Sequence, residues 1–135
     1  WDEGYRAEEL MRCLVLTADA ARALGDPDAA RRFIRQAIEK AHTLSNLPHT
    51  LMAMGAAARW SAEIGLIDRA IELACMVAEH KSTYAADRAK AKTLLETLRA
   101  AHPKDVYAAA STRGKILSVE AAIERALNEM VESKG

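Results

Sequence analysis

Two segments of the chain carry the same short pattern at a fixed spacing, and this repeat constrains the fold more than any other feature. Gly25 is followed three residues later by Asp28, and Gly65 is followed in the same way by Asp68, so the two copies lie 40 residues apart. Each copy stands between two stretches of helical hydrophobic periodicity. A period between about 20 and 50 residues is typical of solenoids, in which each repeat is one supersecondary unit stacked on its neighbours. The sequence therefore predicts stacked helix pairs, an architecture that usually presents a binding surface.

The patterning of the whole chain is that of an all-α protein. Apolar residues recur every three or four positions, alternating strand patterns are missing, and alanine, the best helix former, fills many apolar positions. We expect about seven helices, over residues 3–24, 27–45, 49–64, 67–80, 84–101, 104–113 and 118–132. Gly25, Gly65 and Gly114 are predicted to end helices. Asp26, with Pro27 after it, is predicted to start one.

Within these helices the spacing predicts which side is buried. The expected inward face of the first helix consists of Leu10, Cys13, Leu14, Thr17, Ala18, Ala21 and Leu24. The fourth helix is apolar over a wider arc, which indicates neighbours on more than one side. Gly55, in the middle of the third helix, is expected to allow another helix to approach closely. The last helix pairs an apolar face with a polar one, as a helix that caps the end of a stack requires.

The length of 135 residues corresponds to one domain. We divide residues 1–135 into two helix-pair units, at about 3–45 and 48–80, followed by capping helices at about 83–133. No low-complexity segment or long linker interrupts this order. Because the chain begins with Trp1 rather than Met, we expect it to be part of a longer protein.

Charge and cysteine content narrow the classes of partner and the compartment. The 19 basic residues equal the 19 acidic residues, so there is no overall positive field to attract nucleic acid or an acidic membrane. The sequence shows no secretory signal and no apolar run of about 18 residues. Cys13 and Cys75 both fall on apolar helix faces and are expected to be reduced, buried thiols, which fits a cytoplasmic protein.

No residue pattern points to catalysis, a cofactor or a metal. None of the four histidines pairs with another at helical ligand spacing, and neither cysteine has a partner at zinc-site spacing. Serine nucleophile elbows and Gly-rich phosphate loops are missing too. A helix-turn-helix spacing around Ala110 and Gly114 precedes a helix whose open face is acidic, which phosphate would repel. We therefore expect neither an enzyme nor a direct nucleic-acid-binding domain.

The repeat resembles the tetratricopeptide repeat, in which two helices pack through small residues around a Gly-Asp turn. The positions that carry the resemblance are Ala18, Gly25, Asp26, Ala30 and Ala37 in the first unit and Ala58, Gly65 and Ala70 in the second, with Val77 where the family usually has alanine. The chain departs from the family pattern in its period of 40 residues, where about 34 is usual. It also lacks the closing proline and has Leu66 in place of the turn aspartate. Longer periods are similar to those of MalT-like bacterial regulators.

A second resemblance covers the C-terminal part of the chain. Residues 106–110, 113–115 and 117–122 resemble a tail that ends the repeat regions of large bacterial signalling proteins. These include ATPase-containing LuxR-type regulators, nucleotide cyclases and protein kinases, and residues 84–98 resemble the helix before that tail. The resemblance implies the C-terminal sensor or scaffold segment of a bacterial signalling or transcription-regulatory protein, whose catalytic or DNA-binding modules lie elsewhere.

The tetratricopeptide resemblance also implies where a partner would bind, because the first helix of each pair lines a concave groove in that family. The groove positions carried over to this chain are Arg12, Val15, Asp19 and Arg22 in the first unit and Met52, Gly55, Arg59, Ala62 and Glu63 in the second. Arginine binds a carboxylate through two parallel hydrogen bonds, so a peptide or an acidic ligand could be held there. The alternative is a solvated wall of mixed charge that binds nothing.

These observations favour protein–protein interaction or scaffolding as the function. Two alternatives stay open. One is a sensor domain whose groove binds a small molecule or peptide and controls an attached ATPase, and the other is a self-associating module that forms homo-oligomers through an exposed repeat face. The basic cluster of Arg31, Arg32 and Arg35 on the second helix is expected to be a solvated outer face, with a docking patch for an acidic partner as the alternative.

Overall fold

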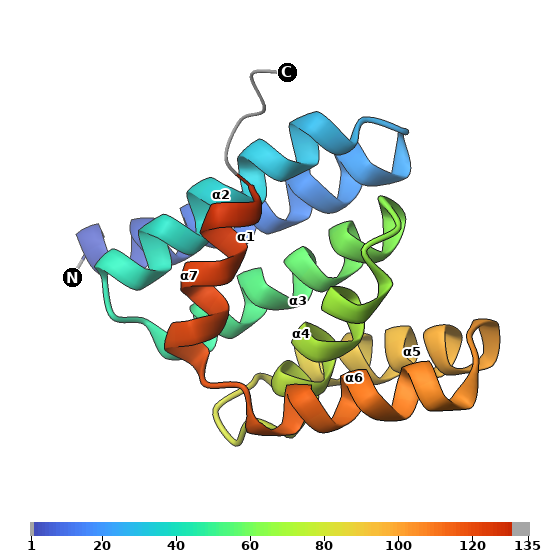
Figure 1. Ribbon diagram of the computed structural model, residues 1–135. Coiled ribbons are helices and arrows are strands. Elements are labelled where there is room, and N and C mark those ends of the chain that lie inside the picture. The colour runs from blue at the N-terminus through green and yellow to red at the C-terminus, as the bar shows by residue number, and fades with distance from the viewer. Residues whose placement is uncertain (1, 131–135) are drawn as a thin grey trace.

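The computed structural model describes residues 2–130, with side chains from residue 6 onward, and the regular secondary structure of this part is entirely α-helical. Its seven helices are α1 Asp2–Ala23, α2 Pro27–Thr43, α3 Leu47–Glu63, α4 Ile67–Glu79, α5 Ala85–Ala101, α6 Lys104–Ile116 and α7 Val119–Glu129 (Figure 1). The predicted all-α class and helix number are confirmed for the described residues. Trp1 and residues 131–132 of the predicted last helix lie outside them. None of the described helices has the length and apolar character that crossing a membrane requires.

Three turns of the same geometry separate α1 from α2, α2 from α3 and α3 from α4. Gly25, Ser45 and Gly65 adopt positive φ angles of 83°, 53° and 89°. In each turn this residue and the next one donate backbone hydrogen bonds to carbonyl groups of the last helical turn. Glycine adopts this conformation without steric cost, which made Gly25 and Gly65 recognisable as helix ends. Ser45 carries no such signal, yet it makes the same turn.

Polar side chains cap the helices that follow the first two turns. Asp26 and Asn46 each accept a hydrogen bond, at 3.1 Å, from the backbone N–H three residues ahead. The Asn46 cap starts α3 at Leu47, two residues before the predicted start, and Pro48 fits the first turn because a donor is not needed there. Leu66 offers no side-chain cap to α4.

The centre of the molecule consists of α3 and α4. α3 packs against α1, α2, α4, α5 and α7, and most of its residues are buried. α4 is buried from Ala70 to Ala78 without interruption, between α3, α5 and α6. The wide apolar arc predicted for this helix is thereby confirmed.

Gly55 and Gly114 both lie within helices of the molecule's core, and only one of them marks a close helix contact. At Gly114 an added Cβ would lie 2.6 Å from the carbonyl oxygen of Glu72, so α6 and α4 meet there backbone to backbone. α6 continues through Gly114 to Ile116, so the prediction that Gly114 ends this helix is wrong. At Gly55 an added Cβ would meet its nearest neighbour, the Arg59 guanidinium, at an ordinary 3.6 Å. The expectation of a close helix contact at Gly55 is also wrong.

The buried face of α1 differs from the predicted one. Met11 and Val15 are buried, although neither was on the predicted face. The predicted members that lie exposed are Leu10, Cys13, Thr17 and Leu24. α1 carries two apolar stripes, and periodicity alone does not decide which of them meets a neighbour. Because α1 packs against α2 and α3 within the described chain, the stripe that faces these helices is covered and the other is open to solvent.

α7 folds back over the molecule and does not extend the row of helices (Figure 1). It packs across α2 and α3 and buries Ala122, Ile123 and Ala126. Its last carbonyl groups, those of Leu127 and Met130, accept hydrogen bonds from Arg35 at 3.2 Å and Arg31 at 3.3 Å. Cations are favourable at this end of a helix dipole. The expectation of a wholly solvated basic face on α2 is therefore wrong for Arg31 and Arg35.

Candidate binding groove

Two adjoining cavities form a groove between α1, α3 and α5. The first has a volume of about 450 Å³, and its lining includes Arg12, Val15, Met52, Tyr84, Asp87 and Lys90. The second has a volume of about 630 Å³, and its lining includes Arg22, Arg59, Glu63, Lys90, Leu94 and Leu98. Lys90 lines both cavities, so they meet at its side chain.

The structure brings the predicted groove residues together along this surface. Arg12 and Met52 line the first cavity, and Arg22, Arg59 and Glu63 line the second. Val15 and Ala62 line the groove as well, one in each cavity. Asp19 and Gly55 are absent from the lining, although both lie next to the Arg59 side chain. That these residues bind a partner stays a prediction.

An ion pair between α1 and α3 holds the wall of the groove. The Arg59 guanidinium donates from Nε to Asp19 Oδ1 and from Nη2 to Asp19 Oδ2, both at 2.9 Å. Bidentate pairs of this kind are among the strongest hydrogen-bonded contacts in proteins. The Arg59 side chain is 14% exposed, so a ligand carboxylate would have to compete with Asp19 for it. Arg59 is therefore better placed to fix α1 against α3 than to clamp a ligand.

Two further arginines of the groove are held less firmly. Arg22 lies 3.7 Å from Asp19 and 3.9 Å from Glu63, and its Nε is buried without a hydrogen-bond acceptor among the described atoms. Arg12 pairs with Glu9, one turn earlier on α1, at 3.0 Å, and both side chains are about half exposed. Buried polar groups are normally hydrogen-bonded. The Arg22 Nε is therefore a donor with unused capacity in this wall.

α5 supplies a third wall, which the repeat did not predict. Tyr84, Asp87, Lys90, Leu94 and Leu98 line the groove from this helix and its N-cap position. The repeat pattern fades before α5, so this helix was expected to cap the stack. The spacing of three and four between these positions is a signal that could have placed them on one face. Lys90 is exposed and makes no hydrogen bond or ion pair with a described residue.

Asp87, which lines the first cavity, and His49, which contacts its Tyr84 ring, have shifted pKa values. Burial raises the pKa of the Asp87 carboxyl, and the positive charge of Lys90 opposes this shift. His49 is 1% exposed, its Nδ1 lies 3.1 Å from the Oδ1 of Asn46, and its ring meets the Tyr84 ring edge-on with centroids 5.6 Å apart. Burial lowers the pKa of His49, so its imidazole is neutral near neutral pH.

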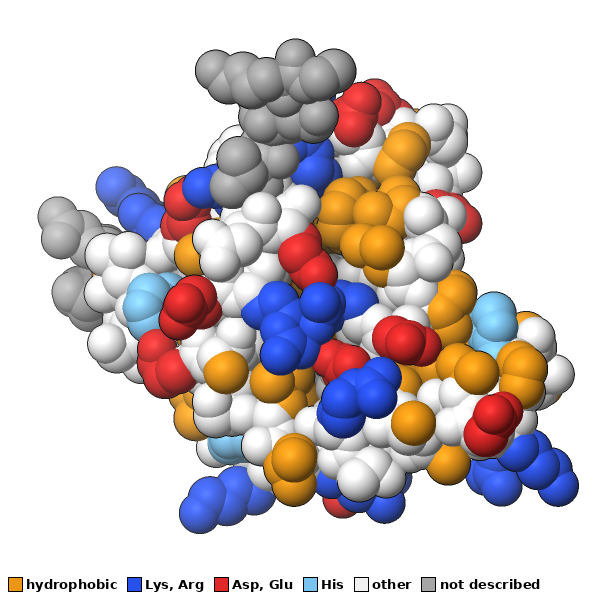
Figure 2. All heavy atoms as spheres, viewed as in Figure 1, with side chains coloured by type: hydrophobic (Ala, Val, Ile, Leu, Met, Phe, Trp, Pro, Cys, Tyr) orange, Lys and Arg blue, Asp and Glu red, His pale blue; other side chains and the backbone are white. Residues whose placement is uncertain are grey.

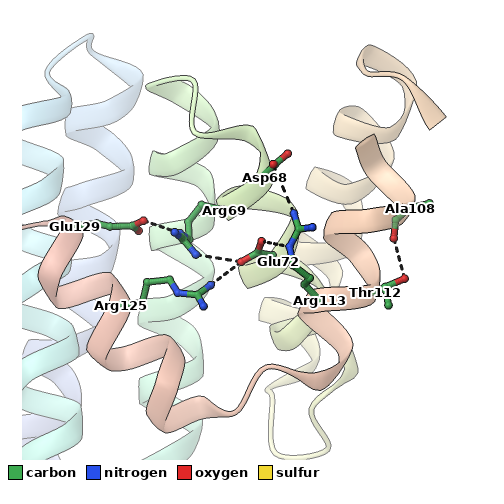
Figure 3. A network of polar contacts seen from close by, with 8 residues as sticks. All are labelled: Asp68, Arg69, Glu72, Ala108, Thr112, Arg113, Arg125 and Glu129. Atoms are coloured by element: carbon green, nitrogen blue, oxygen red, sulfur yellow. Dashed lines mark hydrogen bonds and ion pairs between the residues drawn. The ribbon is translucent and has the colours of Figure 1, made fainter. Parts of the chain in front are cut away.

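A second polar cluster joins α4, α6 and α7 on the face of the molecule that α7 crosses (Figure 3). Its centre is Glu72, which is 5% exposed and accepts hydrogen bonds from Arg69 at 3.1 Å, Arg113 at 2.8 Å and Arg125 at 2.7 Å. Arg69 also donates to Glu129 at 2.6 Å. Basic and acidic side chains are mixed near the middle of this face (Figure 2). Because each of these arginines already faces a carboxylate, the cluster is a clasp between helices and not an open anion site.

The remaining reactive groups do not form a site. The described residues contain no group of three or more His, Cys, Asp and Glu side chains that could hold a metal ion. Cys75 is buried, its thiol donates to the Ser111 hydroxyl at 3.4 Å, and burial raises the pKa of this thiol. Cys13 is exposed on α1, so the expectation that both thiols are buried is wrong for Cys13.

No model of a known protein family matches this chain, and no curated protein or solved structure is significantly similar to it. The resemblance to tetratricopeptide repeats therefore rests on the residues of this chain.

Proposed function

We propose that the chain is a tetratricopeptide-like α-solenoid and that its groove binds a segment of a protein partner. The observation that carries the proposal is the groove along α1, α3 and α5, the helices that would be the first members of three successive pairs. The packing order supports this arrangement, because α3 contacts α1 and α2 before it, and α5 contacts α3 and α4 before it. The domain would serve as a scaffold in a larger, MalT-like or LuxR-type bacterial regulator in the cytoplasm. It would perform no catalysis and contact neither nucleic acid nor membrane.

The lining of the groove supports a partner segment that carries apolar and acidic side chains. Leu16, which is exposed, and the half-buried Leu94 offer apolar surface at the walls, whereas Met52 and Leu98 are buried and contribute only a small part of the lining. Lys90 is exposed at the point where the cavities meet, and its charge acts on the Asp87 carboxyl beside it without forming an ion pair, whereas the Arg59 guanidinium is already bound by Asp19. An acidic side chain of the partner would therefore meet Lys90 first.

Charge reversal on α5 tests the proposal. Peptides selected from a random library against the full chain are measured by calorimetry with Lys90→Glu and with Lys92→Glu. Lys92 is exposed on the same helix and does not line either cavity, so it is the matched control. We expect Lys90→Glu to weaken binding about tenfold or more, or ~1.4 kcal/mol, and Lys92→Glu to leave it unchanged. Equal effects of the two variants, or peptides indifferent to both, would contradict binding in the groove.

A second candidate function is sensing of a small anionic ligand that controls an attached ATPase. It is favoured by the unpaired, buried Nε of Arg22 beside a cavity of about 630 Å³, a size within the range of small-molecule sites. A ligand that binds the folded state raises the melting temperature. A panel of anionic metabolites should then contain a stabilising compound whose effect is lost in Arg22→Gln. Stabilisation that persists in this variant would place the ligand elsewhere.

A further inference from the structure

The open side of α1 carries a stripe of uncharged residues at alternating spacings of three and four. This outer stripe consists of Leu10, Cys13, Thr17, Ala20 and Leu24, all of them exposed. The charged residues of the same stretch, Arg12, Asp19 and Arg22, lie at the groove instead. A continuous uncharged stripe at this spacing is what a helix presents to another helix that packs along it.

The internal repeat shows what covers the same positions elsewhere in the molecule. A shift of 40 residues along the sequence takes the first four members of the outer stripe to Thr50, Ala53, Ala57 and Trp60 of α3. These four residues are all buried, with at most 5% of their surface exposed. The Trp60 indole Nε1 donates a hydrogen bond at 2.9 Å to the carbonyl oxygen of Pro27, the first residue of α2. The position in α3 that corresponds to Ala20 therefore faces α2.

α1 thus has the packing face of an inner helix without the helix that covers it. In the described chain the second helix of one pair packs on the first helix of the next, as α2 does on α3 and α4 on α5. We propose that the outer stripe is a docking site for an amphipathic helix of the α2 type, from another hairpin of this repeat, that lies along α1 as α2 lies along α3. This proposal does not depend on what the groove binds.

The residues of the stripe define the chemistry of the docked helix. Cys13, Thr17 and Ala20 have small side chains, so a helix can approach closely at the middle of the stripe. Leu10 and Leu24, at 46% and 86% exposure, would be covered at its two ends. A charged group on the docked face would be buried without a partner, which is costly. The partner face is therefore apolar, like the face of α2 that buries Ala30, Ile34 and Ile38.

Adding one repeat to the full chain tests the proposal. A copy of residues 7–46, in which Cys13 is changed to Ser, is inserted immediately before residue 7. The copy ends with a second α2, which is then joined to the original α1 by the same turn that joins α2 to α3. The reporter is Cys13 of the original α1, read by thiol labelling and peptide mapping. We expect its labelling rate to fall at least tenfold relative to the parent chain. An insertion that carries Ile34→Asp and Ile38→Asp in the copy is the control, and there Cys13 should label as in the parent.

A variant of the stripe separates docking from folding of the chain. Thr17→Glu should leave the melting temperature of the parent chain unchanged, because Thr17 is exposed there. The same substitution in the original α1 of the extended chain should restore rapid labelling of Cys13. Cys13 that labels as fast in the extended chain as in the parent would overturn the proposal, whether or not circular dichroism shows the added copy to be helical. The parent chain could instead dimerise in a concentration-dependent way, and Thr17→Glu could abolish this dimerisation. That result would overturn the assignment of an α2-type helix to the stripe, because the stripe would then bind a second copy of the chain.

Discussion

Replacing Gly114 with alanine tests the close approach of α6 to α4. The new Cβ would lie 2.6 Å from the carbonyl oxygen of Glu72 and 2.7 Å from the Cβ of Cys75. Both residues are buried in α4, a helix held by neighbours on several sides, so neither can move aside as the end of a flexible side chain could. The two helices would have to separate by roughly 0.8 Å, the difference between 2.6 Å and an ordinary contact of 3.4 Å.

The size of the effect follows from two opposing contributions. Overpacking of a buried contact typically costs about 1–3 kcal/mol, and the backbone clash places Gly114→Ala near the upper end. Alanine recovers about 0.5–1 kcal/mol through its higher helix propensity. We expect a net loss of about 2 kcal/mol in the free energy of unfolding. Gly55→Ala is the matched control, because its Cβ would meet the nearest atom at 3.6 Å. It should show the propensity gain alone, about 0.5–1 kcal/mol.

Urea unfolding followed by far-UV circular dichroism measures both variants against the parent chain. The two midpoints should move in opposite directions, down for Gly114→Ala and up for Gly55→Ala. A domain of this size shifts its melting temperature by roughly 3–5 °C per kcal/mol, so thermal unfolding should agree. A Gly114→Ala protein as stable as the parent would refute the argument that α4 and α6 meet backbone to backbone at this position.

Glu72→Ala should lower the free energy of unfolding by about 2–3 kcal/mol, because it removes the acceptor that three arginines share and leaves Arg125 without a carboxylate, while Arg69 keeps Glu129 and Arg113 keeps Asp68. An unchanged urea midpoint would argue against the clasp. Stability should also fall as the pH drops below about 6.5, because the pKa of His49 is lowered in the folded protein and the unfolded chain takes up the proton first. The same pH dependence in His49→Phe would show that another group is responsible. An alkylating reagent at mildly alkaline pH should label Cys13 in the folded protein and Cys75 only after unfolding, since Cys75 is buried and its thiol pKa is raised. Equal labelling rates in the folded protein would contradict the burial of Cys75.

Much of the candidate groove could be predicted because the repeat assigns equivalent positions to equivalent helix faces. Arg12 and Met52 are one repeat apart, and so are Asp19 and Arg59, and each pair lies at the groove. The sequence did not indicate that Asp19 and Arg59 bind each other, because that contact depends on how closely α1 and α3 pack. The α5 wall escaped prediction because the repeat pattern that located the other two walls is lost before Lys90.

The sequence by itself determined the helices and most of their ends. Helical periodicity, an Asp26 side chain that caps the next turn, and glycines at 25 and 65 that accept a left-handed conformation act over a few residues, so they can be recognised without knowing the neighbours. The tertiary structure alone decided which stripe of α1 is buried, that Gly114 and not Gly55 meets another backbone, and that α7 returns across α2 and α3. These outcomes depend on which surfaces meet across long separations in the chain. An amphipathic pattern specifies that a face will be covered, but the choice among faces is made by the helices that pack against it.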